Sequence, residues 1–159
     1  MIVADIAIGQ AATPADIEAV RVLYMEYAAA MGFKLCFQGF DRELAALPGA
    51  CVPPGGTLLL ARVGGEPAGC VAVSPLDGGA AELRRLFVRS RWRRRGLGRA
   101  LATAAIEAAR QAGHAVIRLE TVPDRMAEAE TLYRSLGFGP APPYARTDPA
   151  IASYEMRLD

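Results

Sequence analysis

Apolar residues recur at helical spacing in three long stretches of the chain. These stretches span residues 14–31, 97–110 and 126–136. The second has the clearest apolar stripe, formed by Leu97, Ala100, Leu101, Ala104, Ala105 and Ala108. Thr13 is a suitable N-cap for the first because Pro14 follows it and Asp16 lies in its first turn. A glycine lies at or shortly after the end of each stretch, and a shorter helix is predicted over FDRELAAL, residues 40–47.

Strand-like runs fill most of the remaining sequence. They lie at residues 2–8, 57–63, 67–76, 80–88, 115–121 and 151–158. The apolar residues of the first run alternate incompletely, which predicts a strand buried on both faces. The pairs Gly64–Gly65 and Gly78–Gly79 separate the second, third and fourth runs and predict tight hairpin turns.

The order of these elements indicates a mixed sheet. A strand, two helices and a meander of three strands come first, and helix, strand, helix and strand follow. An antiparallel half joined to a β-α-β crossover gives a mixed α/β sheet covered by helices. The 159 residues show no repeat and no low-complexity linker, so we expect one domain over residues 1–159.

Composition narrows the class of protein further. Cys36, Cys51 and Cys70 are odd in number and form no CxxC motif, so they predict small core residues rather than disulfides or a metal site. No apolar run approaches the length of a membrane span, and no leader pattern opens the chain. We therefore expect a cytoplasmic protein without a metal and without a membrane partner.

The cations are concentrated in one short region. The formal net charge is +1, yet eight of the eighteen lysines and arginines lie between Arg84 and Arg99. Here WRRRGLG, residues 92–98 and hereafter the glycine–arginine turn, joins the predicted strand 80–88 to the predicted helix 97–110. Backbone N–H groups at such a turn and at a helix N-terminus bind anions such as pyrophosphate. The pattern favours a local anion site over a generally basic protein.

Other interpretations of this turn match less well. A P-loop requires lysine and then serine or threonine after its second glycine, whereas Arg99 and Ala100 follow Gly98. A dinucleotide motif requires GxGxxG, whereas GLGRAL ends in leucine. Nucleic-acid binding is disfavoured by the near-zero net charge and by Trp92 being the only aromatic residue in the cluster. An exposed turn whose glycines only let the chain bend is the remaining alternative.

Two motifs resemble those of a known family. RRRGLG, residues 93–98, has the pattern R-x-x-G-x-G, follows a strand ending in LFV and precedes an amphipathic helix. It resembles the acyl-CoA signature of the GNAT superfamily of N-acyltransferases. LYRSLGF, residues 132–138, is similar to the tyrosine-containing helix end of that superfamily. FQGFDRELAALPG resembles a bacterial subgroup of small single-domain members.

The resemblance implies a fold and a cofactor. The fold is a twisted mixed sheet of six to seven strands flanked by about four helices, whose fourth and fifth strands splay apart to admit the pantetheine arm of acetyl-CoA. Acetyl-CoA is the implied acyl donor, with CoA as product and no metal. The residues that it assigns to the cofactor are Leu86, Phe87, Val88, Arg93, Arg94, Arg95, Gly96, Leu97, Gly98, Arg99 and Ala100.

It also implies a catalytic set. Acyl transfer needs a base, a donor to the oxyanion and an acid for the leaving thiolate. Glu82 is the implied base, the Val88 amide the implied donor if the strand bulges there, and Tyr133 the implied acid. Glu82 lies six residues before Val88, so we expect the two to share a strand face. The alternatives are a Glu82 paired with Arg84 or Arg85, and a Tyr133 that serves only the core.

Two residues depart from a functional pattern. Many members carry an asparagine seven residues before the tyrosine, where this chain has Met126. His114 follows a helix stop without a cysteine or carboxylate at ligand spacing, so we expect a surface residue.

We expect an acetyl-CoA-dependent N-acetyltransferase, monomeric or homodimeric, that acetylates a primary amine of a small molecule or peptide through a tetrahedral intermediate. A non-catalytic acyl-CoA-binding or regulatory module is the alternative. The predicted acceptor wall, residues 33–40 with Tyr144 and the proline-rich tail, is apolar and has little acid. It favours a monoamine or amino-acid-like acceptor over a polycation.

Overall fold

The computed structural model describes residues 5–31, 40–122, 127–144 and 151–158. Its helices are α1 (Pro14–Met31), α2 (Phe40–Ala46), α3 (Leu97–Gln111) and α4 (Ala127–Leu136), with a 3₁₀ turn at Ser90–Trp92. Its strands are β1 (Ile6–Gln10), β2 (Thr57–Val63), β3 (Glu66–Leu76), β4 (Ala80–Val88), β5 (Val116–Thr121), β6 (Gly139–Ala141) and β7 (Ala152–Arg157). The predicted helices, the meander and the last two predicted strands are confirmed within a few residues.

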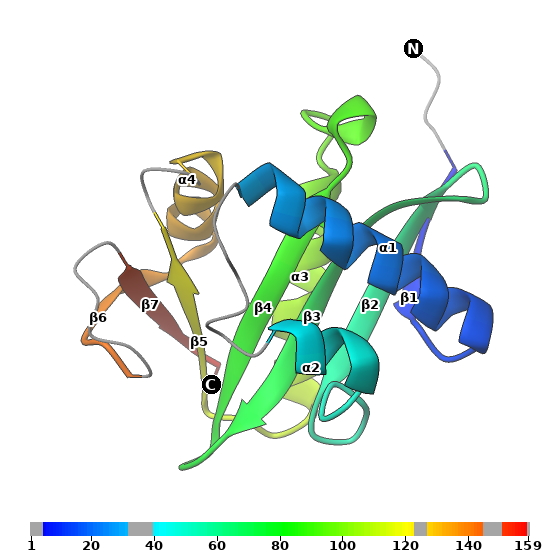
Figure 1. Ribbon diagram of the computed structural model, residues 1–159. Coiled ribbons are helices and arrows are strands. Elements are labelled where there is room, and N and C mark those ends of the chain that lie inside the picture. Colours follow the sequence, from blue (N-terminus) through cyan, green and yellow to red (C-terminus); the bar gives the residue numbers. More distant parts are fainter. Residues whose placement is uncertain (1–4, 32–39, 123–126, 145–150, 159) are drawn as a thin grey trace.

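The strands form one seven-stranded sheet in the order β1-β2-β3-β4-β5-β7-β6. Strands β1 to β4 pair antiparallel in sequence order, and β5, β7 and β6 form a second antiparallel group. The parallel pairing of β4 with β5 joins the two groups. The predicted mixed sheet is confirmed, with β4 and β5 as the fourth and fifth strands across it (Figure 1).

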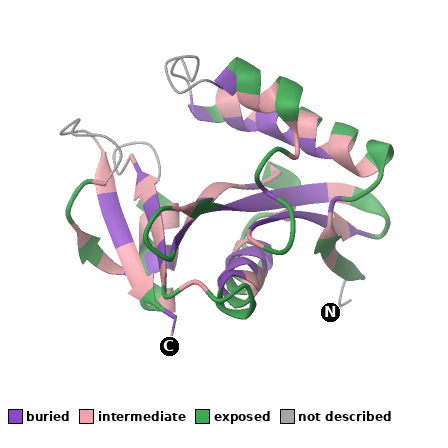
Figure 2. Cartoon of the chain, turned by 90° about the horizontal axis from the view of Figure 1, so that it is seen from below, coloured by how far each residue is buried: buried purple, intermediate pink, exposed green. Residues whose placement is uncertain are grey.

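Helices cover both faces of the sheet. Figure 1 shows α1 and α2 in front of the strands and α3 behind them. A buried cluster that includes Leu58, Leu60 and Phe87 packs with α1 and α2, and a larger one that includes Val71 and Leu83 packs with α3. Seen from below, the buried residues line the surfaces where helices meet the sheet (Figure 2). Each face of β4 therefore belongs to a different core.

The start of α1 forms as the sequence predicts. The Thr13 hydroxyl accepts a hydrogen bond from the Asp16 amide at 3.1 Å, and the Asp16 carboxylate accepts bonds from the amides of Ala12 and Thr13. Arg62 on β2 donates to the same carboxylate at 2.6 Å. These bonds satisfy amides that a helix N-terminus otherwise leaves unpaired.

Three sequence expectations are wrong. The first strand is an edge strand with exposed residues, not one buried on both faces, because β1 pairs only with β2. The apolar stripe of α3 is rotated, because Ala102, Ile106 and Ala109 are buried where Ala100, Ala104 and Ala108 were expected. The short strand β6 was missed, since GPA contains a glycine and a proline and has no alternation.

Among the described residues, no helix combines the length and the apolar character that crossing a membrane requires.

Candidate active site

Strands β4 and β5 separate after a short shared segment. They pair only from Ala80–Glu82 to Val116–Arg118, while β4 continues to Val88. A cleft of about 310 Å³ opens along the unpaired end of β4, and Leu86, Phe87 and Val88 line it. The expected splay of the fourth and fifth strands is confirmed. Tyr27 of α1 and Leu132 of α4 also border this cleft.

A bulge in β4 changes which residues share a face. The register of β4 with β3 shifts between the pairs Cys70–Phe87 and Ala72–Arg84, so an extra residue lies opposite Val71. Arg85 within the bulge has φ of 57°. A bulge puts two consecutive residues on one side and reverses the alternation beyond it.

The reversal overturns one prediction. Before the bulge, Ala81 and Leu83 belong to the α3 core, whereas after it Leu86 and Val88 pack against that core. Glu82 therefore lies on the α1 and α2 face, and Glu82 and Val88 are on opposite faces. The bulge also lies at Arg85 and Leu86 rather than at Val88 itself.

The backbone of Val88 is nevertheless turned toward the opening between the strands. The amide of Arg89 donates to the Ala68 carbonyl on β3 at 2.8 Å, and Val88 is paired with Gly69. Successive backbone groups of a strand point to alternate sides, so the N–H and C=O of Val88 point away from β3. The Val88 carbonyl accepts a hydrogen bond from Nε of Arg93 at 2.7 Å.

The glycine–arginine turn delivers a helix N-terminus to the cleft. Gly96, the N-cap of α3, has φ of 81°, a conformation that favours glycine. The first intrahelical bond runs from the Ala100 amide to the Gly96 carbonyl at 3.0 Å. The amides of Leu97, Gly98 and Arg99 consequently have no acceptor within the helix, which is the donor arrangement that binds anions.

The arginines of this turn have different surroundings. Arg93 and Arg94 border the cleft, and Arg93 lies 5.6 Å from the centre of the Phe87 ring. Arg94 is largely exposed and lies 3.6 Å from Glu128 on α4. Arg95 lies instead over the Trp92 ring at 5.5 Å, and Arg99 donates to the Ser135 hydroxyl at 2.7 Å.

Two of the backbone positions predicted for the cofactor have side chains elsewhere. The Leu97 side chain is buried in the α3 core, and Ala100 is half-buried along that helix. Any contribution of these two positions to an anion site is therefore made through the backbone, whereas Gly98 borders the cleft directly.

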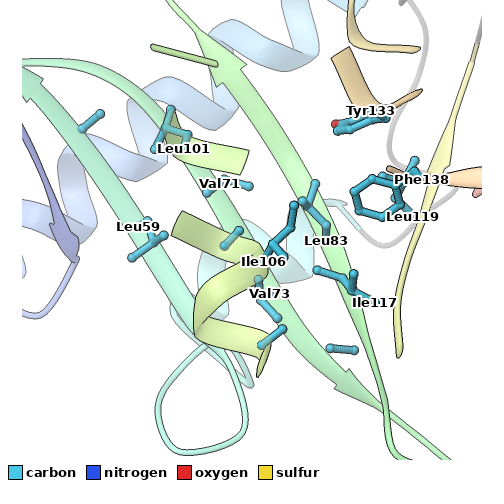
Figure 3. Packing of buried hydrophobic residues seen from close by; sticks show 14 of the residues in the cluster. Leu59, Val71, Val73, Leu83, Leu101, Ile106, Ile117, Leu119, Tyr133 and Phe138 are labelled. Atoms are coloured by element: carbon cyan, nitrogen blue, oxygen red, sulfur yellow. The ribbon is translucent and has the colours of Figure 1, made fainter. Parts of the chain in front are cut away.

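Tyr133 belongs to the core cluster that packs with α3 and does not itself border the cleft, although its neighbour Leu132 does. Its side chain is buried, and its ring packs edge to face against Phe138 with centres 5.7 Å apart. Figure 3 shows its hydroxyl directed away from Phe138. Burial, with a smaller contribution from Tyr27, raises the pKa of Tyr133 above its ordinary value, so the phenol keeps its proton at neutral pH.

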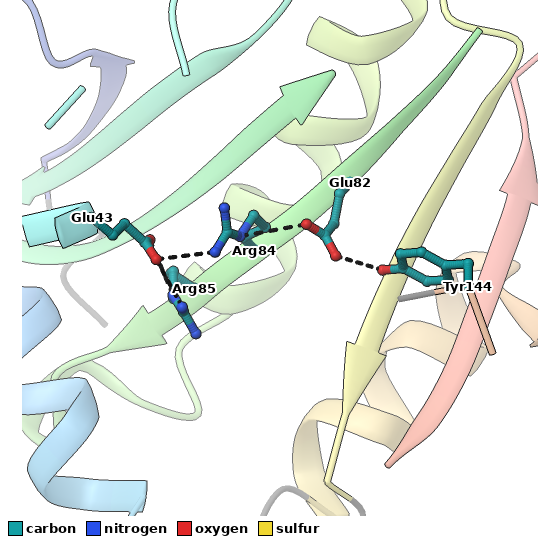
Figure 4. Close-up of polar contacts among 5 residues, drawn as sticks. All are labelled: Glu43, Glu82, Arg84, Arg85 and Tyr144. Atoms are coloured by element: carbon teal, nitrogen blue, oxygen red, sulfur yellow. Dashed lines mark hydrogen bonds and ion pairs between the residues drawn. The ribbon is translucent and has the colours of Figure 1, made fainter. Parts of the chain in front are cut away.

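Glu82 belongs to a polar network on the α1 and α2 face (Figure 4). The Tyr144 hydroxyl donates to its carboxylate at 2.7 Å, and Arg84 Nε lies 3.5 Å from its other oxygen. Burial and the adjacent Glu82 carboxylate raise the pKa of Tyr144. The Glu82 side chain is only 16% exposed, so the alternative of an exposed, ion-paired glutamate holds for the pairing but not for the exposure.

Glu43 on α2 completes this network and was missed in the sequence. It accepts hydrogen bonds from Arg85 at 2.8 and 3.1 Å and from Arg84 at 3.0 Å. Tyr27 at the cleft was missed as well. The signal that could have found Glu43 is the FDRELAAL motif, which places a carboxylate on the inner side of the predicted helix 40–47.

The other predicted positions divide into three groups. Cys51 and Cys70 are buried, as predicted. His114 is half-buried rather than a plain surface residue, because its Nε2 lies 2.8 Å from the Gly55 carbonyl oxygen. Met126, Cys36 and most of the predicted acceptor wall, residues 33–39, lie outside the described residues.

The structure is thus an α/β fold with a mixed sheet opened between its fourth and fifth strands and a helix N-terminus at the opening. The sequence profile of the Acetyltransferase (GNAT) family matches residues 20–138. The chain belongs to this family of acetyltransferases.

Individual relatives agree. An uncharacterised N-acetyltransferase of Schizosaccharomyces pombe is 36% identical over 157 residues, covering 98% of this chain and 95% of that protein. A GNAT-family acetyltransferase from Staphylococcus aureus has a TM-score of 0.82 at 18% identity and covers 98% of this chain and 100% of that one. The PaiA N-acetyltransferase of Thermoplasma acidophilum, solved with coenzyme A, has a TM-score of 0.73 at 16% identity, covering 96% and 99%.

Proposed function

We propose that the protein is an acetyl-CoA-dependent N-acetyltransferase, which moves an acetyl group to the primary amine of a small molecule or peptide by direct attack. The observation that carries the proposal is the cleft along Leu86–Val88, with the α3 N-terminal amides that have no acceptor within the helix beside it. The family membership and the relatives with N-acetyltransferase names support it.

The residues at the cleft suit the acyl donor. The amides from Leu97 to Arg99, which have no acceptor within the helix, together with the left-handed Gly96, match the needs of a pyrophosphate. Arg93 and Arg94 add positive charge at the same opening. When bound, the donor supplies an activated acetyl thioester, and the protein residues orient it and move protons.

Three groups would carry the chemistry. The Val88 amide, which points away from β3, would donate to the thioester carbonyl as negative charge develops there. Glu82 would take the proton of the attacking amine through a chain of waters, because the bulge puts it on the other strand face from Val88 and it does not border the cleft. Tyr133, whose raised pKa keeps it protonated, would protonate the leaving thiolate.

Tyr133→Phe tests the assignment. The ring and its packing against Phe138 stay, so we expect kcat to fall by about 100-fold or more while CoA affinity and the free energy of unfolding change little. Turnover is followed by thiol release from acetyl-CoA, and affinity by calorimetry. Tyr154→Phe is the matched control, because it removes a hydroxyl bonded to Glu130 and Arg134, away from the cleft.

Each failure has a distinct meaning. If Tyr133→Phe lowers kcat only to the extent that it destabilises the fold, Tyr133 is a purely structural core residue. CoA binding without thiol release for any amine would favour the non-catalytic module. The absence of CoA binding would refute the whole proposal.

A further inference from the structure

A second cavity, of about 340 Å³, lies beneath α2 on the face of the sheet that carries Glu82. The residues at its border that bear on chemistry are Tyr24, Arg42, Glu43, Cys51, Ser74 and Arg84. Its volume suits a small molecule rather than a protein segment. None of these residues belongs to the cleft along Leu86–Val88.

Hydrogen-bond donors dominate this cavity. The Tyr24 hydroxyl is fully buried and has no hydrogen-bond partner among the described residues. Burial raises the pKa of Tyr24, so the hydroxyl stays a donor. Burial also raises the pKa of Cys51 to about 11, which leaves a neutral thiol at this border. A buried donor without a partner costs free energy and is satisfied when an acceptor group enters.

The charges at the cavity favour an anion. Arg42 and Arg84 border it, and Arg85 shares the Glu43 carboxylate with Arg84. Among the described residues that border the cavity, Arg42 and Arg84 are the cations and Glu43 is the anion, so positive charge is in excess. Arg84 keeps N–H groups beyond the one that it gives Glu43, because a guanidinium carries five. One further carboxylate would balance the site.

The cavity adjoins the proposed base. Ser74, at its border, is the direct cross-strand partner of Glu82, so the two side chains share a face. Arg84 Nε lies 3.5 Å from the Glu82 carboxylate, which makes the pair an ion pair that is longer than a good hydrogen bond. Arg84 and Glu82 therefore place a cation and an anion side by side.

We propose that the acceptor is an α-amino acid whose carboxylate binds at Arg84, Ser74 and Tyr24 while its amine faces Glu82. The amine and carboxylate of an α-amino acid are separated by a single carbon, which matches the close spacing of Arg84 and Glu82. Ala46, Leu47 and Pro48 form an apolar part of the border and favour an aliphatic side chain. The inference rests on the proposed N-acetyltransferase function and names its substrate class.

A matched acceptor series tests the proposal. Leucine, leucinamide and 3-methylbutylamine share a side chain but differ in the carboxylate. We expect kcat/KM for leucine to exceed that for the other two by about 10- to 150-fold, the worth of a hydrogen bond to a charged group. The amine of leucinamide is less basic than the amine of leucine and is more often unprotonated at neutral pH. Chemical reactivity alone would therefore favour leucinamide over leucine.

Arg84→Gln should abolish most of this preference, because it should lower kcat/KM for leucine far more than kcat/KM for leucinamide. Tyr24→Phe should also lower kcat/KM for leucine relative to leucinamide, and it keeps the ring that packs against Phe40. Arg110→Gln is the control, since this arginine pairs with Glu107 on α3, on the opposite face of the sheet. Equal kcat/KM for the acid and the amide would overturn the proposal.

Leucine binding, measured by saturation-transfer NMR without acetyl-CoA, separates the two proposals. Binding that Arg84→Gln abolishes, without any acetylation, supports the amino-acid site and counts against the proposed enzyme. Acetylation of amines with no preference for the acid supports the enzyme and refutes the amino-acid site. If leucine neither binds nor is acetylated, the amino-acid site is refuted.

Discussion

Removal of the Glu43 carboxylate should destabilise the protein more than the loss of any surface ion pair. Glu43 binds Arg85 through two hydrogen bonds, and the Arg85 side chain is only 7% exposed. Arg85 also lies 5.8 Å from the ring of Tyr27 and 5.4 Å from that of Phe40. In Glu43→Ala this guanidinium stays buried and loses both hydrogen bonds to the Glu43 carboxylate.

The magnitude follows from burial. Breaking a buried ion pair by removal of one partner costs about 3–5 kcal/mol. Arg84, which is 30% exposed, adds about 1 kcal/mol or less. We expect Glu43→Ala to lower the free energy of unfolding by about 3–5 kcal/mol, and Tm by about 6–20 °C for a chain of this size.

Urea unfolding followed by circular dichroism measures the loss. Glu107→Ala is the control, because Glu107 pairs with Arg110 on the surface of α3 and should cost about 0.5 kcal/mol or less. The double variant Glu43→Leu with Arg85→Met should be more stable than Glu43→Ala, since neither charge is then left unpaired. A loss below about 1 kcal/mol in Glu43→Ala, or a double variant as unstable as the sum of its singles, would refute the reasoning.

Two further predictions concern helix N-termini. Bonds from Arg62 and from the amides of Ala12 and Thr13 lower the pKa of Asp16 to about 2, so its stabilising effect is present above the unfolded pKa and lost as pH falls toward the folded one. The stability difference between wild type and Asp16→Asn should therefore shrink from about pH 5 to about pH 2.5 in urea unfolding, and a constant difference would contradict this. Gly96→Ala should cost about 1–2 kcal/mol through its φ of 81°, whereas Gly98→Ala, inside α3 and without positive φ, should be neutral or stabilising by up to about 1 kcal/mol. If both glycine variants change the free energy of unfolding in the same direction, positive φ at Gly96 does not explain the effect of Gly96→Ala.

The elements of the fold could be predicted because each has a local signal. Thr13 caps α1 and Gly137 ends α4 with φ of 110°, as residue types at those positions indicate. The face of a helix is a weaker signal in an alanine-rich segment. Residues of α3 such as Ala104 and Ala105 have the same side chain, and only the packing against β3 and β4 decides that Ala105 is buried.

The site was predictable where it depends on backbone and not where it depends on side-chain partners. Glycine at positions 96 and 98 indicates a turn by its residue type alone, so the turn and the helix N-terminus could be predicted. The partners of Glu82 come from distant parts of the chain, since Tyr144 lies 62 residues away in sequence. No periodic pattern connects such positions, and spacing along one strand could not reveal the network.

The bulge at Arg85 explains why counting residues along β4 wrongly predicted that Glu82 and Val88 share a strand face. A non-glycine residue in the left-handed region costs about 1–3 kcal/mol and persists only where its surroundings hold it. Here the Glu43 ion pair and the rings of Tyr27 and Phe40 hold the Arg85 side chain. The same contacts join α2, which borders the proposed amino-acid cavity, to the segment Leu86–Val88 that lines the proposed acyl-donor cleft. Loss of Glu43 should therefore disturb both sides of the proposed reaction together, because one strained residue fixes the face that each presents.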